Sequence, residues 1–340
     1  MQYLYTLTST ENDYFYEQFL LSATSLKIQI PDAQIILLCD TKTIETLAEK
    51  RQNHLKLIAK IISVETPARF NQIEISRWVR TSMRRLVKGD FLFLDGDTVV
   101  TDDLSAIFQT HTNFSACLDK HSLIDIHSKK TSIITKNKLL GFDSHITNHH
   151  YNGGVLFCPD TPETHKIFDR WHELWLYSRK KNIIRDQPSL NMAIYENQSC
   201  FSELDGTWNC QIAYNGLPYL SCSRIIHYFA TDLTFNQSSF LLANEEIFKS
   251  IKNTGEIPNE ALILLKNPRS AFSKQSQIIS GDDMLFVLNS NIFQFNFLLR
   301  KKMPFLFIFF NFLFGLLKGI VKFFVIRFYN KKDLGRYIYN

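Results

Sequence analysis

The stretch FLFLDGDTVV, residues 91–100, joins a continuous apolar run to two aspartates, Asp95 and Asp97. A short run of this kind is typical of a strand that is buried on both faces of a sheet. Two carboxylates separated by one small residue can turn toward one divalent cation, and we expect Gly96 to let the backbone bend without a side chain in the way. A cation there can neutralise the charge of a diphosphate group. The stretch therefore predicts a metal site at the end of a buried strand.

Strand-like and helix-like segments alternate along the chain before this motif. The segments expected as strands are residues 2–8, 34–39 and 55–64, and those expected as helices are residues 14–30, 41–51 and 74–87. This alternation implies βαβ units and a mainly parallel sheet. Ligands of such a Rossmann-like open sheet gather beyond the carboxyl ends of its strands, which is where the two aspartates stand.

The chain after the motif is less regular. Residues 119–148 are polar and weakly periodic, as expected of an active-site loop. A strand at 155–158, a helix at 164–179 and a late strand at 223–229 follow. The domains expected from this pattern are a main α/β domain over residues 1–240, an extension or linker over 241–299, and a basic, Phe-rich tail over 300–340.

Charge is distributed unevenly along the 340 residues. With 45% hydrophobic and 21% charged residues, the composition is that of a globular protein and excludes wholesale disorder. Residues 298–340 carry a net charge of +8, which leaves −3 for residues 1–297. The acidic body argues against nucleic acid as a partner, and the basic tail indicates an anionic surface. Six scattered cysteines without a Cys-x-x-Cys pair, and a start without an export signal, are expected of a cytosolic chain.

The tail contains a long apolar segment. The uncharged segment of residues 303–317 is shorter than the ~20 residues needed to span a bilayer. If this part of the tail is a helix, it has one narrow polar stripe, which consists of Asn311, Gly315, Lys318 and Lys322. A basic, Phe-rich helix with such a stripe lies in the membrane interface. We therefore expect residues 300–332 to hold the protein peripherally on the cytoplasmic face of the cell membrane. The alternative is a C-terminal tail anchor that spans the bilayer at about residues 305–329.

Three further motifs follow FLFLDGDTVV in a fixed order. They are YNGGVLF at residues 151–157, RDQPSLN at 185–191 and IIHYF at 225–229. Together the four motifs, over about residues 1–230, resemble the GT-A nucleotide-sugar transferases, and most of all glycosyltransferase family 8. The resemblance implies a GT-A fold, with a Rossmann-like open mixed sheet flanked by helices. It also implies transfer of a hexose from a UDP-sugar to a glycan or lipid-linked acceptor, with retention, in cell-surface polysaccharide synthesis.

The resemblance assigns roles to individual residues. Mn²⁺ (or Mg²⁺) on the donor diphosphate would be bound by Asp95, Asp97 and His227. After this histidine the family continues with a Gly and a Lys-Pro-Trp that touch the phosphates, whereas this chain reads His-Tyr-Phe-Ala-Thr. The donor-binding residues carried over from the family are Thr8 and Asn12 for the uridine, Arg77 for the diphosphate, and Asp119 and Asn152 for the sugar. Asp186 and Gln187 are the candidate catalytic residues near the anomeric carbon, and Trp208-Asn209 is expected to pack beneath the site.

Each of these roles has a simpler alternative. His227 can be a packed strand histidine, Asp186 a routine helix N-cap and Asn12 an ordinary turn residue. At the level of the whole protein, DGDTVV also fits an aspartyl-nucleophile, haloacid dehalogenase-like phosphatase. Those enzymes carry the nucleophile on the first strand of the fold, whereas about ninety residues come first here. A non-catalytic sugar-nucleotide-binding membrane adaptor is the remaining alternative, suggested by the altered residues after His227.

Overall fold

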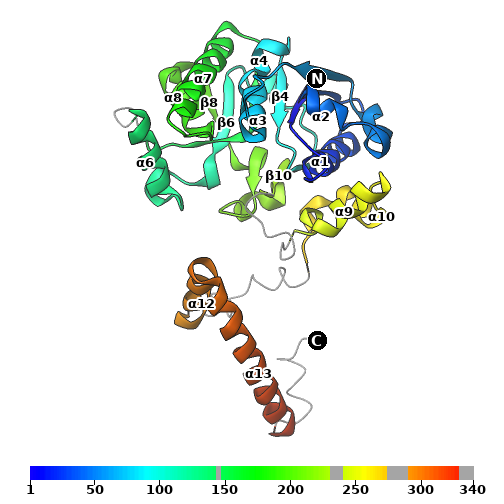
Figure 1. Ribbon diagram of the computed structural model, residues 1–340, viewed down its shortest axis with the longest axis vertical. Helices are drawn as coiled ribbons and strands as arrows, with labels where there is room; N and C mark the ends of the chain where they lie inside the picture. The colour runs from blue at the N-terminus through cyan, green and yellow to red at the C-terminus, as the bar shows by residue number, and fades with distance from the viewer. Residues whose placement is uncertain (143–146, 230–239, 274–289, 329–340) are drawn as a thin grey trace. The chain divides into compact units, whose positions relative to one another are not determined.

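The computed structural model describes residues 1–142, 147–229, 240–273 and 290–328 of the chain. It divides into two compact units, Met1–Ser273 and Lys274–Asn340, which are described in turn (Figure 1).

A seven-stranded mixed sheet forms the centre of the first unit. Its strands in spatial order are β3 (Lys60–Val64), β2 (Gln34–Asp40), β1 (Gln2–Leu7), β4 (Phe91–Leu94), β7 (Tyr151–Cys158), β6 (Phe114–Leu118) and β8 (Phe201–Leu204). β1 pairs in parallel with β2 and β4, whereas β7 runs antiparallel to both β4 and β6. The expected open mixed sheet is confirmed.

Strand β4 is buried on both faces, as its apolar run predicts. Leu92 and Leu94 belong to the core that includes α1 (Phe15–Gln29). Phe91 and Phe93 belong to the opposite core, which the helices α3 (Gln72–Thr81), α7 (Pro162–Lys180) and α8 (Gln187–Glu196) cover. Because successive side chains of a strand point to opposite faces, a strand between two helical layers needs apolar residues at every position. The same constraint places Asp95 where the strand leaves these two cores.

A second, three-stranded sheet adjoins the end of β4. It consists of β5 (Thr98–Val100), β10 (Ile225–His227) and β9 (Cys210–Gln211). β10 lies in the middle, antiparallel to β5 and parallel to β9. The register places His227 opposite Thr98, one residue after Asp97. This pairing brings the late strand of the sequence to the aspartate pair.

The other described α-helices of the first unit are α2 (Thr41–Glu45), α4 (Met83–Leu86), α5 (Ile107–Thr110), α6 (Lys130–Leu140), α9 (Glu245–Thr254) and α10 (Asn259–Lys266). α9 and α10 contact α1 (Figure 1), and Phe248, Ile251 and Ala261 join the same core as α1. The first unit therefore extends past residue 240, where the sequence analysis ended the main domain.

Local differences from the expected elements have simple causes. Residues 119–148 contain the helix α6 and are not a loop throughout; its buried positions are Ile133, Asn137 and Leu140, and the asparagine conceals the apolar spacing. The strand expected at 55–64 begins only at Lys60, because Glu49–Leu57 forms a 3₁₀ segment. The helix expected at 74–87 is divided into α3 and α4.

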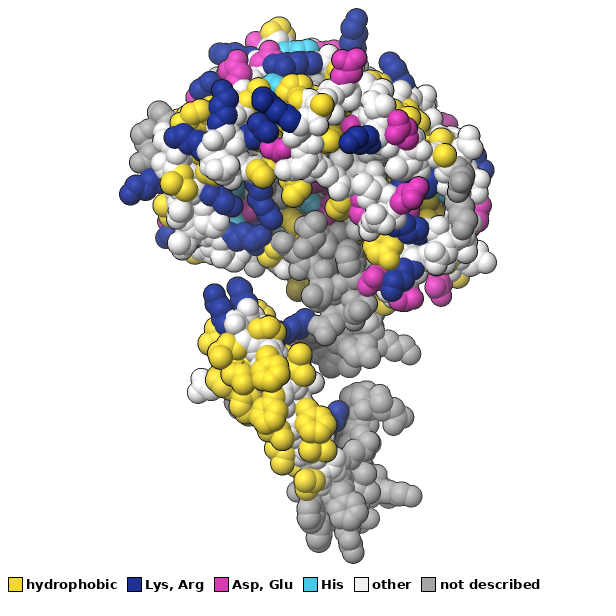
Figure 2. All heavy atoms as spheres, viewed as in Figure 1, with side chains coloured by type: hydrophobic (Ala, Val, Ile, Leu, Met, Phe, Trp, Pro, Cys, Tyr) yellow, Lys and Arg dark blue, Asp and Glu magenta, His cyan; other side chains and the backbone are white. Residues whose placement is uncertain are grey.

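The second unit contains two described helices, α12 (Asn291–Lys302) and α13 (Pro304–Phe328). Hydrophobic side chains cover their visible surface (Figure 2), and among the exposed ones are Phe297, Phe305, Ile308 and Phe312. Within the described part of the chain, α13 is long and apolar enough to cross a membrane: the window Pro304–Val321 has a mean hydropathy of 2.0 and none of it is buried.

Candidate active site

The turn between β4 and β5 holds the aspartate pair. The Asp95 N–H donates to the carbonyl oxygen of Gly154 on β7 over 2.8 Å, and the Asp95 carbonyl accepts from Thr98 Oγ1 over 2.7 Å. A Cβ built on Gly96 would lie 3.5 Å from the nearest atom, the backbone nitrogen of Phe19, which is an ordinary contact. A small side chain at position 96 would therefore fit beside Phe19, so the space left by Gly96 is not what the turn depends on.

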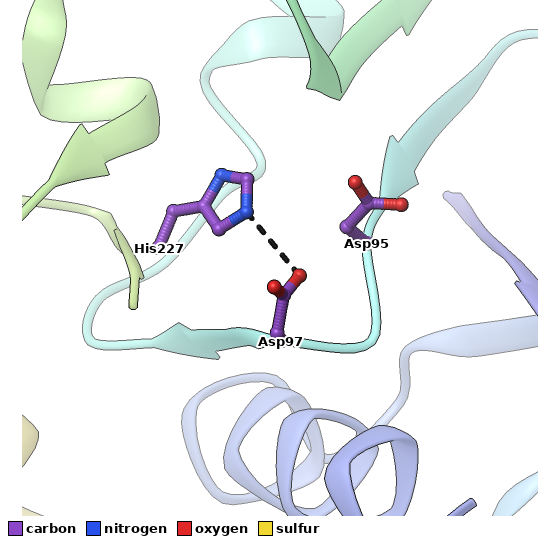
Figure 3. Close-up of side chains that lie close together, drawn as sticks. All are labelled: Asp95, Asp97 and His227. Carbon is purple, nitrogen blue, oxygen red and sulfur yellow. Dashed lines mark ion pairs between the residues drawn. The ribbon is translucent and has the colours of Figure 1, made fainter. Parts of the chain in front are cut away.

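Three potential ligands converge on this turn. One ligand atom each from Asp95, Asp97 and His227 lies within 4.8 Å of the other two, and Nε2 of His227 is 3.2 Å from Oδ1 of Asp97. Figure 3 shows His227 and Asp97 facing each other with Asp95 beside them. Carboxylate oxygens and an imidazole nitrogen form a donor set that suits Mn²⁺ and related divalent ions. The residues present thus fit the metal that the sequence analysis expected.

The imidazole of His227 is held between two neighbours. The ring of Phe229 stacks on it with centroids 4.0 Å apart and an interplanar angle of 5°. Gly154, from the YNGG motif, provides the space for the ring, because a Cβ there would lie 2.4 Å from Cε1 of His227. Phe229, two residues after His227 in the altered segment, thus supports the histidine with its aromatic ring. Ala230 and Thr231, which complete the altered segment, lie outside the described residues.

Two arginines on α3 lie beside the aspartates. Arg77 Nε is 3.1 Å from Oδ1 of Asp186, and Arg80 contacts both Oδ1 of Asp95 and, at 3.9 Å, Oδ2 of Asp186. Burial lowers the pKa of the Arg80 guanidinium to about 10, although Asp186 lies beside it. Arg80 therefore remains charged at neutral pH and joins the two aspartates electrostatically.

Sequence reasoning selected Arg77 and missed Arg80. The sequence spacing could have indicated Arg80, since residues three apart on a helix share a face.

The other two arginines between residues 74 and 87 have different roles. Arg84 is buried and donates to the carbonyl oxygens of Gly89 and Cys158, whereas Arg85 forms a surface ion pair with Asp169.

Asp186 is not acting as a helix cap. It stands at the N-cap position of α8, yet within the described chain its side chain accepts no cap hydrogen bond. The carboxylate turns instead toward Arg77 and Arg80.

The next residue, Gln187, is half-buried at the first position of α8. Among the described residues, none accepts from or donates to its side-chain amide, which leaves this group free for a ligand.

Asp119 and Asn152 lie below the metal ligands and are bonded to each other. Asn152 Nδ2 donates to Oδ1 of Asp119 over 2.8 Å, and both residues are buried. Burial alone would raise the pKa of Asp119, but hydrogen bonds from His127 and Asn152, together with the nearby His150, hold that pKa well below its usual value. Asp119 is therefore a carboxylate at neutral pH.

The two expected uridine contacts lie at the carboxyl end of β1, on the sheet edge shared with β4. Thr8 directly follows the strand, and its buried hydroxyl has no hydrogen-bond partner within the described residues. Asn12 is exposed, and its N–H donates to Thr10 Oγ1 over 3.2 Å in a local turn. Thr8 thus presents an unused polar group near the site, whereas Asn12 has the surroundings of a turn residue.

The fold is shared with solved glycosyltransferase structures. The galactosyltransferase LgtC, solved in complex with donor and acceptor sugar analogues, is 16% identical and aligns with a TM-score of 0.50 over 76% of this chain and 98% of its own. The apo structure of the bifunctional glycosyltransferase WbbM is 14% identical, with a TM-score of 0.51 over 78% of this chain and 51% of its own. At these identities the likeness shows the GT-A fold alone.

Sequence comparison identifies the family. None of the curated protein sequences compared with the chain matches it. The profile of glycosyl transferase family 8 matches residues 11–232, which contain Asp95, Asp97, Asp186 and His227 and make up more than half of the chain. This match sets aside the phosphatase. The chain belongs to glycosyl transferase family 8 and is a GT-A glycosyltransferase.

Proposed function

We propose that this glycosyltransferase is metal-dependent and transfers a hexose from a UDP-sugar to a glycan or lipid-linked acceptor in cell-surface polysaccharide synthesis. The observation that carries the proposal is the convergence of Asp95, Asp97 and His227, whose ligand atoms lie within 4.8 Å of one another. These residues come from a turn and from a strand far along the chain, so their meeting is a product of the fold. Mn²⁺ or Mg²⁺ bound there would neutralise the diphosphate of the donor.

The protein's own cations support this assignment. Arg77 is a quarter exposed and lies next to Asp186, so its guanidinium can reach phosphate oxygens beside the metal. Arg80 is partly buried, with 12% of its side chain exposed, and bridges Asp95 to Asp186. A site with fixed positive groups around a leaving diphosphate stabilises charge that develops during transfer.

The sugar would lie between the metal ligands and the start of α8. There, Asp186 is oriented by two arginines, and Gln187 offers an amide free of described partners. The connection from Asp95 through Arg80 to Asp186, the residue before Gln187, supports their role as contacts near the anomeric carbon. We propose that transfer occurs with retention, as the family resemblance implies, and we nominate no nucleophile. Thr8, with its unpartnered hydroxyl, is the better candidate of the two proposed uridine contacts.

We further propose that residues 300–332 hold the enzyme on the cytoplasmic face of the membrane, beside a lipid-linked acceptor. The exposed apolar side chains of α12 and α13 need a covering environment, and hydrocarbon provides one. Basic residues flank α13 on both sides, at residues 300–302 and 331–332. A helix that spans the bilayer would place one of these groups on the far side, whereas an interfacial helix keeps both against the anionic leaflet. The charge pattern therefore favours the interfacial arrangement over the tail anchor.

Replacing Asp97 by Asn tests the metal site. Loss of a direct ligand should weaken Mn²⁺ binding and lower transfer by ~100-fold or more, because even outer-shell changes cost about 10–100-fold. Asp97 is chosen over Asp95 because Asp95 also pairs with the partly buried Arg80. Mn²⁺ binding by calorimetry, release of UDP and thermal unfolding should be measured together. Asp125→Asn, at an exposed aspartate, is the control. Near wild-type turnover of Asp97→Asn at matched metal would show that the ion is bound elsewhere.

A pair of glycine substitutions tests whether the position of the His227 ring matters. Gly154→Ala introduces a Cβ 2.4 Å from Cε1 of His227, so the ring must move and Mn²⁺ affinity should fall at least about tenfold. Gly96→Ala introduces a Cβ in ordinary contact and should preserve the affinity. Titration of both folded variants with Mn²⁺ compares them directly. Equal affinities of the two variants would argue against His227 as a ligand.

Charge removal from the tail tests the membrane arrangement. Changing Arg300, Lys301 and Lys302 to Gln should weaken binding to vesicles that contain anionic lipid by about 100-fold, at ~1 kcal/mol for each basic residue near the surface. Binding to neutral vesicles should change little, and UDP-sugar hydrolysis should persist. Co-sedimentation with the two vesicle types measures the effect. If the wild-type protein instead resists both high salt and carbonate and is released only by detergent, α13 spans the bilayer.

A further inference from the structure

A chain of buried polar side chains leads away from His227 into the protein. We call the four residues Asn209, Asn152, Asp119 and His127 the buried relay. All four are almost fully buried, with at most 6% of each residue exposed, so water does not complete their hydrogen bonds. Each must therefore be satisfied by its neighbours in one definite orientation.

The orientation of the relay is fixed at Asn152. An ionised carboxylate can only accept, so the side-chain nitrogen of Asn152 faces Oδ1 of Asp119, at 2.8 Å. A backbone N–H can only donate, so the side-chain oxygen of Asn152 faces the nitrogen of Gly154, at 2.9 Å. Two independent contacts thus require the same orientation of this amide.

The orientation passes from Asn152 to His227 through Asn209. Asn209 Nδ2 donates to the oxygen of Asn152 over 3.1 Å, which leaves Oδ1 of Asn209 as an acceptor 3.0 Å from Nδ1 of His227. Nδ1 must therefore carry the hydrogen. In the neutral imidazole the lone pair is then on Nε2, the nitrogen that faces Asp97.

The hydrogen position at the other end of the relay, on His127, is fixed in the same way. The backbone N–H of Lys129 donates to Nδ1 of His127 over 2.9 Å, so Nε2 of that histidine carries the hydrogen and donates to Oδ2 of Asp119 over 3.0 Å. Both oxygens of Asp119 are engaged, and neither amide of the relay can turn over without placing two like groups in contact.

We infer that Asn209 is a positioning residue that selects the metal-binding tautomer of His227, with Asn152, Asp119 and His127 holding Asn209 in place. This inference rests on the proposed function, since it assigns a purpose to the tautomer only if His227 binds a metal. A neutral imidazole with its hydrogen on Nε2 cannot ligate through that nitrogen, so without the relay part of the population would be unable to bind. The Trp208-Asn209 pair thus does more than pack beneath the site.

The test uses the full-length protein with Asn209→Ala, Asn209→Asp and the control Asn137→Ala, which removes another buried asparagine, from α6 outside the relay. Imidazole ¹⁵N shifts of His227 in the metal-free protein, at a pH where the ring is neutral, report its tautomer. Mn²⁺ affinity without donor and thermal unfolding are measured on the same samples. Asn209→Ala should yield a tautomer mixture and Mn²⁺ binding weaker by about 10–100-fold. Asn209→Asp retains an acceptor for Nδ1–H and should retain the wild-type tautomer, although it loses the donor to the oxygen of Asn152 and should unfold at a lower temperature.

Three results would overturn the inference, and they can be told apart. A wild-type tautomer and wild-type Mn²⁺ affinity in a folded Asn209→Ala variant would show that the relay does not act on the metal. Wild-type protein that binds no divalent ion would overturn the proposed function, and the inference with it. Equal losses in Asn209→Ala and Asn137→Ala would mean that any buried asparagine has this effect, which also contradicts a specific role for the relay.

Discussion

The active site depends on the antiparallel pairing of β5 with β10. This pairing sets His227 opposite Thr98 and so brings an imidazole to two aspartates that stand far earlier in the chain. β5 is itself anchored to α1, since Ser25 Oγ accepts from the Val100 N–H over 2.8 Å and Ser22 shares a hydrogen bond with Thr98. Because α1 packs on the large sheet, the main core determines the position of the metal ligands.

Charge balance is the second constraint on the site. Three carboxylates, from Asp95, Asp97 and Asp186, lie beside two guanidinium groups, from Arg77 and Arg80. Partly buried charges of one sign need partners of the other, because removing one member of a buried pair leaves the remaining charge uncompensated. In the proposed function, a divalent ion at Asp95, Asp97 and His227 would add positive charge to this cluster, and an anionic diphosphate would offset it. The charge balance of the cluster therefore supports the proposal of a ligand that brings metal and phosphate together.

Much of this arrangement could be predicted from local sequence. The run FLFL must be a doubly buried strand, and the order of the four motifs predicts the GT-A fold that the structure confirms. What local sequence could not supply was orientation. The spacing places Arg80 near Arg77 on the helix, but its contacts with Asp95 and Asp186 depend on the tertiary structure. The role of Asn209 likewise follows from hydrogen bonds to residues distant in the chain. The close approach of Gly154 to His227 likewise joins two residues that are distant in the chain.

The central claim is that nucleotide binding at this site depends on a divalent ion. Thermal unfolding of the full-length enzyme with UDP, in the presence of Mn²⁺ and after chelation, tests it most directly. Ligand at ~100 times its dissociation constant stabilises a protein by about 2.7 kcal/mol, enough to raise the unfolding temperature by several degrees. The account predicts this rise when UDP and Mn²⁺ are present together and little change with UDP after chelation. An equal rise with UDP after chelation, or none under either condition, would contradict it.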